Sequence, residues 1–148
     1  MQTIKAKNSS TSAIWVRTNT GTWGEWKRIV TDDEIYYKPG DKYNSSTNVS
    51  HEGFITGGGK EIYVTVKPQK KLNNVSNVTV NTLKLNIRGI SGYVGTSGAD
   101  FKSYVSSAII PASKDAIVIV LTNSSGWDAT NNTPVVVAGT SAIELTFS

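Results

Sequence analysis

The sequence contains no cysteine and only one histidine, His51. Without cysteine, the chain can form neither a disulfide framework nor a thiolate zinc site, and it has no thiol nucleophile. A single histidine also excludes a metal site built from several imidazoles of one chain. No apolar stretch approaches the roughly 20 residues of a membrane-spanning helix, and the N-terminus lacks the regions of a signal peptide. We therefore expect neither membrane insertion nor a secretory leader.

Charged and apolar residues are scarce too, and short polar residues take their place. Charged residues make up 18% of the 148 residues and apolar residues 38%, both low for a globular protein. The chain has 12 Asn, 17 Ser and 17 Thr, with 13 Gly and only 4 Pro. The net charge of +4 is scattered along the chain, so nucleic-acid binding is not expected. This composition favours an all-β protein with many polar turns.

The N-terminal part predicts a hairpin. Residues 1–11 are polar and without periodicity, so we expect there a frayed start or the trailing end of a longer parent chain. Residues 13–18 predict a strand, and residues 22–30 predict its return after a tight glycine turn. An isolated hairpin is marginal in water, so we expect it to pack on a neighbouring domain, on the body of this chain or on a second copy of it. We place the boundary after the hairpin, with a hairpin segment at 1–33 and a second domain at 34–148.

The second domain shows regular alternation of apolar and polar residues between turn residues, which places every second side chain of a strand toward a core. About eight strands are expected, and an antiparallel β-sandwich, jelly-roll-like, is the predicted fold. Segment 116–121 is apolar on both faces, which favours the middle of a sheet or a subunit contact. The strands are predicted at 35–37, 51–56, 61–67, 75–80, 83–88, 116–121, 134–138 and 143–147, with a strand also preferred within 99–107. The inward residues are Ile62, Val64, Val66, Leu83, Leu85, Ile87, Ile117, Ile119, Leu121, Ile143, Leu145 and Phe147.

Two turns have specific signatures. Pro39 and Gly40 occupy the second and third positions of Lys38–Asp41, which suits a type II turn. Gly57-Gly-Gly59 lies between two alternating segments and predicts a hairpin. The following Lys60 gives the run a superficial likeness to a phosphate-binding loop, but the spacing is wrong and a strand follows instead of a helix.

No catalytic motif is present. A Ser-His-Asp triad needs a base beside its nucleophile, and His51 heads a predicted hairpin strand. The adjacent acids Asp32, Asp33 and Glu34 form a polar joint at the end of the hairpin. The remaining acids show no motif for the paired carboxylates of glycoside hydrolysis. We therefore expect no catalytic residues, no metal ligands and no cofactor.

A polar loop at 123–132 is the preferred binding site. It holds Trp127 between two apolar strands, and Asn123, Asp128 and Asn131 lie beside it in the sequence. An aromatic ring can stack on a sugar while amide and carboxylate groups bind its hydroxyls. Trp127 can instead fold back to cap the sandwich. Tyr93 belongs to a second candidate binding loop at the rim of the sandwich, or it is a half-buried strand residue.

The hairpin has a recognisable pattern. Ile14-Trp-Val-Arg17, a glycine turn and Thr22-Trp-Gly-Glu-Trp-Lys-Arg-Ile-Val30 resemble the Trp-x-x-Trp ending of the knob module in bacteriophage tail fibres and pyocins. There the pattern runs into an acidic joint, as it does here at Thr31-Asp-Asp33. The remainder, from Tyr36-Tyr-Lys-Pro-Gly-Asp41 onwards, looks like the C-terminal β head of tail or baseplate proteins from phages and prophages of Gram-positive bacteria.

The resemblance implies a host-recognition head without enzymatic activity, which binds a bacterial cell-surface saccharide or protein. It also implies a homo-oligomer, most of all a trimer, joined to other tail proteins through its N-terminus. The expected location is the virion, or the bacterial cytoplasm during expression from a prophage. Two alternatives stay open: a carbohydrate-binding or glycan-hydrolysing domain of a bacterial enzyme, and a purely structural virion component.

Overall fold

The computed structural model describes residues 2–7, 13–45, 52–87, 90, 98–127, 135 and 142–148, with residues 2–7, 13–16 and 29 described by their backbone alone. The chain divides into two compact units, Met1–Ile35 and Tyr36–Ser148. The division lies two residues beyond the boundary predicted from the sequence.

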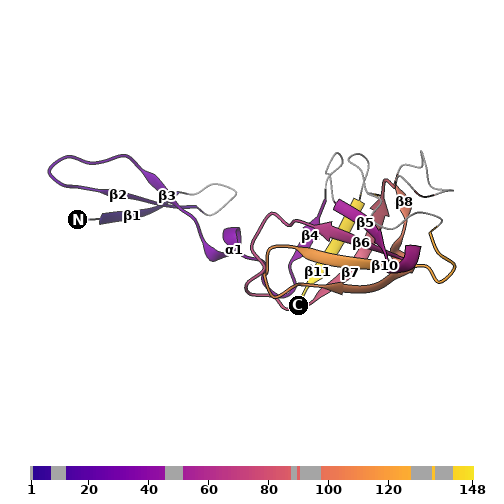
Figure 1. Ribbon diagram of the computed structural model, residues 1–148. Helices are drawn as coiled ribbons and strands as arrows, with labels where there is room; N and C mark the ends of the chain where they lie inside the picture. Colours follow the sequence, from indigo (N-terminus) through magenta and orange to yellow (C-terminus); the bar gives the residue numbers. More distant parts are fainter. Residues whose placement is uncertain are drawn as a thin grey trace. The chain divides into compact units, whose positions relative to one another are not determined.

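The N-terminal unit is a three-stranded antiparallel sheet (Figure 1), in which β1 (Gln2–Lys7), β2 (Ala13–Thr18) and β3 (Lys27–Ile29) lie in that order. The prediction of a frayed start is wrong for residues 2–7, because β1 pairs with β2 along its whole length. The predicted return strand is shorter than expected and is limited to β3. Backbone pairing with a neighbouring strand orders this segment, although its polar sequence did not predict a strand.

A single helical turn, α1 (Asp32–Ile35), ends this unit. The backbone N–H of Thr31 donates to Glu34 Oε2 at 2.9 Å, and Glu34 also pairs with Arg28 through its other carboxylate oxygen. The first contact is half of a capping box, in which the third helical residue reaches back to the residue before the helix. The predicted strand at 35–37 is therefore wrong. Its Tyr36 forms only an isolated parallel bridge with Lys71.

The second unit is a sandwich of two antiparallel four-stranded sheets (Figure 1). One sheet has the strand order β5-β6-β10-β9 and the other β4-β11-β7-β8. This confirms the all-β sandwich predicted from the sequence. Its strands are β4 (Lys42–Asn44), β5 (Glu52–Thr56), β6 (Glu61–Val66), β7 (Val78–Leu85), β8 (Ala99–Asp100), β9 (Val105–Ile109), β10 (Ile117–Thr122) and β11 (Ala142–Phe147).

The core lies between the two sheets and contains all twelve residues predicted for it. Strand β10 lies between β6 and β9, as its apolar pattern predicted. Further buried side chains come from segments between the strands and close the ends of the sandwich. They include Tyr37, Leu72, Phe101, Trp127 and Val135.

Strand β7 corrects the prediction of two separate strands at 75–80 and 83–88. The pairing with β11 shifts between Glu144, which is opposite Thr82, and Leu145, which is opposite Val80, so Asn81 has no partner of its own. This is a β-bulge, and it changes which alternate residues face inward. In the sequence, such a shift in the alternation of apolar and polar residues within one strand is indistinguishable from a break between two strands.

Two turns of this unit have the conformations that their glycines predict. Gly40 has φ of 94°, and the N–H of Asp41 donates to the carbonyl of Lys38 at 3.0 Å, as a type II turn requires. The turn η1 (Gly57–Gly59) joins β5 to β6, which confirms the predicted hairpin. The preferred strand within 99–107 is interrupted, because the 3-10 turn η2 (Lys102–Tyr104) separates β8 from β9.

Candidate functional site

The loop that carries Trp127 packs back onto the sandwich. The backbone N–H of Trp127 donates to the carbonyl of Gly59 at 2.8 Å, and the backbone N–H of Asn123 donates to that of Lys60 at 2.9 Å. These bonds tie the start of the loop to the β5–β6 turn. The indole is only 2% exposed and lies 4.8 Å from the Tyr104 ring and 6.1 Å from the Phe101 ring, centre to centre.

The prediction that Trp127 offers its face to a sugar is therefore wrong, because aromatic neighbours and the core cover that ring. It instead caps the sandwich, the alternative stated above. Asn123 is engaged within the loop as well: its Nδ2 donates to the Gly126 carbonyl at 2.8 Å, and its Oδ1 accepts from the Ser125 N–H at 3.1 Å. The predicted ligand contacts Asp128, Asn131 and Tyr93 lie outside the described residues.

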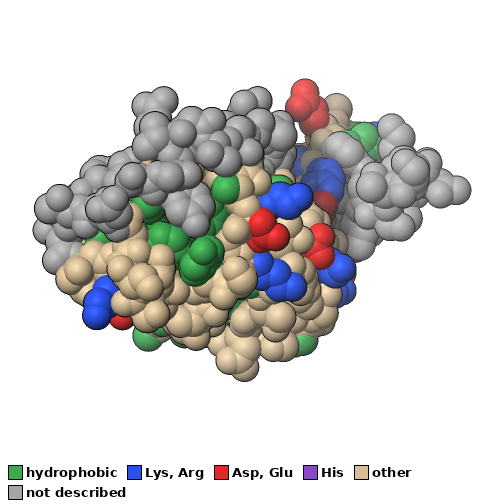
Figure 2. Space-filling view, turned by 90° about the vertical axis from the view of Figure 1, so that its right-hand side faces the viewer, with side chains coloured by type: hydrophobic (Ala, Val, Ile, Leu, Met, Phe, Trp, Pro, Cys, Tyr) green, Lys and Arg blue, Asp and Glu red, His purple; other side chains and the backbone are tan. Residues whose placement is uncertain are grey.

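His51 and most of the predicted strand at 134–138 also lie outside the described residues. Within the part that is described, no three His, Asp or Glu side chains gather to hold a metal ion. No helix among the described residues is long and apolar enough to cross a membrane. Among the described residues on the side shown in Figure 2, Lys and Arg side chains lie beside Asp and Glu side chains.

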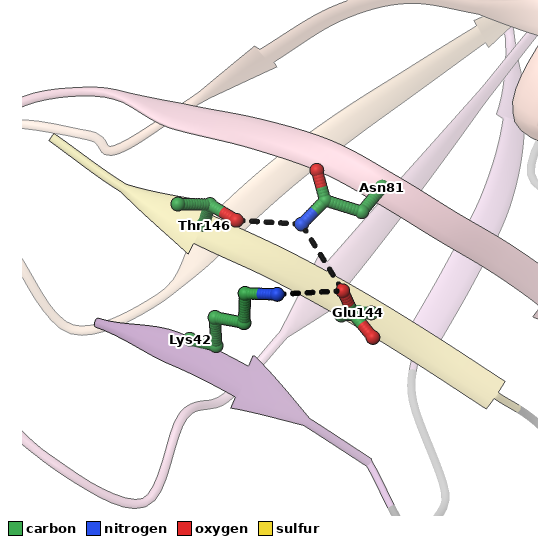
Figure 3. A network of polar contacts seen from close by, with 4 residues as sticks. All are labelled: Lys42, Asn81, Glu144 and Thr146. Atoms are coloured by element: carbon green, nitrogen blue, oxygen red, sulfur yellow. Dashed lines mark hydrogen bonds and ion pairs between the residues drawn. The ribbon is translucent and has the colours of Figure 1, made fainter. Parts of the chain in front are cut away.

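The two outer faces of the sandwich differ in chemistry. The face of the β4-β11-β7-β8 sheet is polar and carries the four-residue network shown in Figure 3. Asn81 Nδ2 contacts Thr146 Oγ1 at 2.6 Å and Glu144 Oε1 at 3.4 Å, and Lys42 Nζ lies 3.5 Å from the same Glu144 oxygen. Exposed ion pairs of this kind contribute about 1 kcal/mol or less. This face is typical of a sheet surface in contact with water.

The outer face of the β5-β6-β10-β9 sheet carries apolar side chains on all four of its strands. Phe54 on β5 is the direct cross-strand partner of Tyr63 on β6, and each side chain is 43% exposed. Tyr63 is in turn opposite Val120 on β10, and the next row pairs Val118 with Ile109, which is 52% exposed. We call these five side chains the apolar outer face.

Polar groups border the apolar outer face. Glu52 pairs with Thr65 at one end of the β5–β6 pair, and Thr56 pairs with Glu61 at the other. Ser107 lies opposite Val120 on the far side. The arrangement places two aromatic rings on rigid strands, with carboxylates and hydroxyls within a few residues. It can stack on a flat apolar ring and accept hydrogen bonds from groups at the rim of that ring.

The sequence contained a signal for this face. Tyr63 alternates out of phase with the core residues of its strand, and 116–121 is apolar at its outward positions as well. The pairing that puts Phe54 beside Tyr63 could not be predicted from the sequence.

Comparisons of the chain with known protein families, with curated proteins and with solved structures found no match.

Proposed function

We propose that this chain is a non-catalytic attachment module, the host-recognition head of a phage tail fibre or baseplate protein, and that it binds a cell-surface saccharide on the apolar outer face. The observation that carries the proposal is the directly paired Phe54 and Tyr63, each 43% exposed, on the edge strand β5 and its neighbour β6. Outward positions of a solvated sheet are normally polar, as they are on the other sheet of the same sandwich. An exposed apolar patch in such a setting marks an interaction surface.

A saccharide suits this surface in shape and in chemistry. The C–H face of a pyranose ring packs on an aromatic ring, and its hydroxyls donate to carboxylates such as Glu52 and Glu61. Strands β5 and β6 are about 4.8 Å apart, so Phe54 and Tyr63 extend from neighbouring positions on the same face. Because the sheet already fixes the backbone of both residues, binding costs little ordering of the protein.

Glycan hydrolysis is less well supported at this face. Glu52 is opposite Thr65, four residues along β6 from Glu61, so the two backbone positions are roughly 13 Å apart along the strand. Glycosidases hold their two carboxyl groups about 5 to 9.5 Å apart. The spacing favours recognition over cleavage.

A shallow platform of this size binds one sugar weakly, with a dissociation constant on the order of millimolar, or about 4 kcal/mol. Useful attachment to a cell then requires several copies acting together. A trimeric head in the virion, as the resemblance implies, supplies three such platforms. Weak single sites and strong attachment are therefore compatible.

The test is a glycan array probed with labelled protein and two variants. Phe54→Thr combined with Tyr63→Thr removes both rings and keeps residues that favour strands. Lys84→Thr, an exposed substitution on the polar outer face, is the matched control. We expect the wild type and Lys84→Thr to bind the same saccharides, and the double variant to lose at least tenfold in signal. Equal binding by all three proteins would contradict the proposal.

A further inference from the structure

The N-terminal sheet has two faces of different chemistry. Residues directly opposite one another in neighbouring strands share a face. The register therefore places Ile4, Ala6, Ile14, Val16 and Ile29 on one face, with Lys27 at its margin. The other face holds the positions of Thr3, Lys5, Lys7, Trp15, Arg17 and Arg28.

The second face also carries an arginine stacked on two tryptophans. The guanidinium carbon of Arg17 lies 4.3 Å from the centre of the Trp23 ring and 4.6 Å from that of the Trp26 ring. Trp23 is 43% exposed and Trp26 is 37% exposed. Since Asn19 and Trp23 form an antiparallel bridge, Trp23 lies on the same face as Arg17, two residues before Asn19. We call Arg17, Trp23, Trp26 and Arg28 the basic aromatic face.

The positive charge on this face is neutralised only in part among the described residues. Arg28 is paired with Glu34, whereas no described carboxylate is paired with Arg17. Stacking fixes the plane of a guanidinium and leaves its edge free to donate. Trp23, Trp26 and Arg28 are all exposed, so the basic aromatic face can contact a ligand in water.

We propose that the basic aromatic face binds a carboxylate-bearing saccharide, such as a polymer of uronic acid. A carboxylate matches the planar edge of a guanidinium, which donates two parallel N–H bonds to it. The sugar ring that bears the carboxylate packs on an exposed indole. The site lies in the other unit from the apolar outer face and does not depend on the function proposed for it.

A single-stranded nucleic acid is the competing anionic ligand. Proteins that bind it place aromatic platforms at intervals along a basic groove that follows the backbone. Here both described indoles pack on one guanidinium, so they do not form a spaced track for successive bases. The arrangement favours one acidic sugar over a run of nucleotides.

The experiment is an NMR titration of the full chain with trigalacturonate, its uncharged methyl ester and a short oligothymidylate at one salt concentration. We compare the wild type with Arg17→Gln, with Arg17→Lys, and with Lys102→Gln, which removes one exposed positive charge from the other unit. The indole N–H signals of Trp23 and Trp26 report contact at the site. The backbone amide signals of β2 and β3 report whether the sheet remains folded.

We expect trigalacturonate to shift both indole signals and to bind at least tenfold more tightly than its methyl ester. Arg17→Gln should weaken binding by about tenfold or more, as expected for the loss of a charge-assisted contact. Arg17→Lys should weaken it several-fold, because an ammonium lacks the planar edge. Lys102→Gln should bind as the wild type does.

Three results would overturn the proposal: equal affinity for the acid and its ester, unchanged binding by Arg17→Lys, or tighter binding of the oligothymidylate than of trigalacturonate. If Arg17→Gln disturbs the amide signals of the sheet, the comparison of acid with ester in the wild type and the Arg17→Lys titration decide the question. None of these results depends on Phe54 or Tyr63, so they are separate from the test of the proposed function.

Discussion

Replacing Trp127 with alanine should destabilise the sandwich strongly. The side chain is 2% exposed and packs against Tyr104 and Phe101. Truncating a buried Trp to Ala costs about 3 to 5 kcal/mol, because it removes apolar contacts and leaves a cavity. For a domain of this size, 1 kcal/mol corresponds to roughly 4 °C in the melting temperature. We therefore expect the melting temperature to fall by roughly 15 °C.

The assay is thermal unfolding followed by circular dichroism in the β-sheet region, with urea unfolding to obtain the free energy. Trp23→Ala is the matched control, because it removes the same side chain from an exposed position in the other unit. That variant should leave the unfolding of the sandwich within about 2 °C of the wild type. If Trp127→Ala also stays within about 2 °C, the indole is not part of the core, and the assignment of Trp127 as a structural residue fails.

Three further predictions concern the sandwich. Leu85→Asp should cost several kcal/mol in urea unfolding, because it buries a charge without a partner; a loss below 1 kcal/mol would contradict its place in the core. Burial raises the pKa of Tyr37 and of Tyr43 above the ordinary value near 10, and hydrogen bonds from the backbone at Lys70 and Gln69 only partly offset this for Tyr37. The unfolded chain then loses these protons at lower pH than the folded protein, so the free energy of unfolding should be full below about pH 10 and fall above it. The fall should be at most about 1.4 kcal/mol per pH unit for each phenol. A free energy of urea unfolding that is unchanged between about pH 9 and 11 would contradict this prediction. Lys42→Met, which removes the ion pair with Glu144, should change the free energy of unfolding by less than about 1 kcal/mol, and a larger loss would show that the pair is structural.

The core of the sandwich could be predicted because burial repeats every second residue in a strand. Ile62, Val64 and Val66 on β6 show this period without interruption, and the structure buries all three. The bulge at Asn81 could not be predicted in the same way. Its only trace in the sequence is a change of phase between Val80 and Leu83, which a turn would produce equally well.

The candidate site was harder to predict, since composition does not say which way a loop side chain turns. Trp127 lies in a polar loop, a setting equally compatible with stacking on a ligand and with capping the core. Tertiary contacts with Phe101 and Tyr104, distant in the sequence, decide between the two. The platform of Phe54 and Tyr63 depends on the register of a hairpin, which its turn fixes and its composition does not.

The most direct test of the account is to locate the saccharide on the protein. The aromatic carbon–proton NMR signals of the full chain would be followed during titration with the saccharide that gives the strongest signal on the array. The account predicts that the ring signals of Phe54 and Tyr63 shift together as the site fills, while those of Trp127 stay in place. Shifts at Trp127, with Phe54 and Tyr63 unchanged, would contradict the central claim that the apolar outer face is the binding surface.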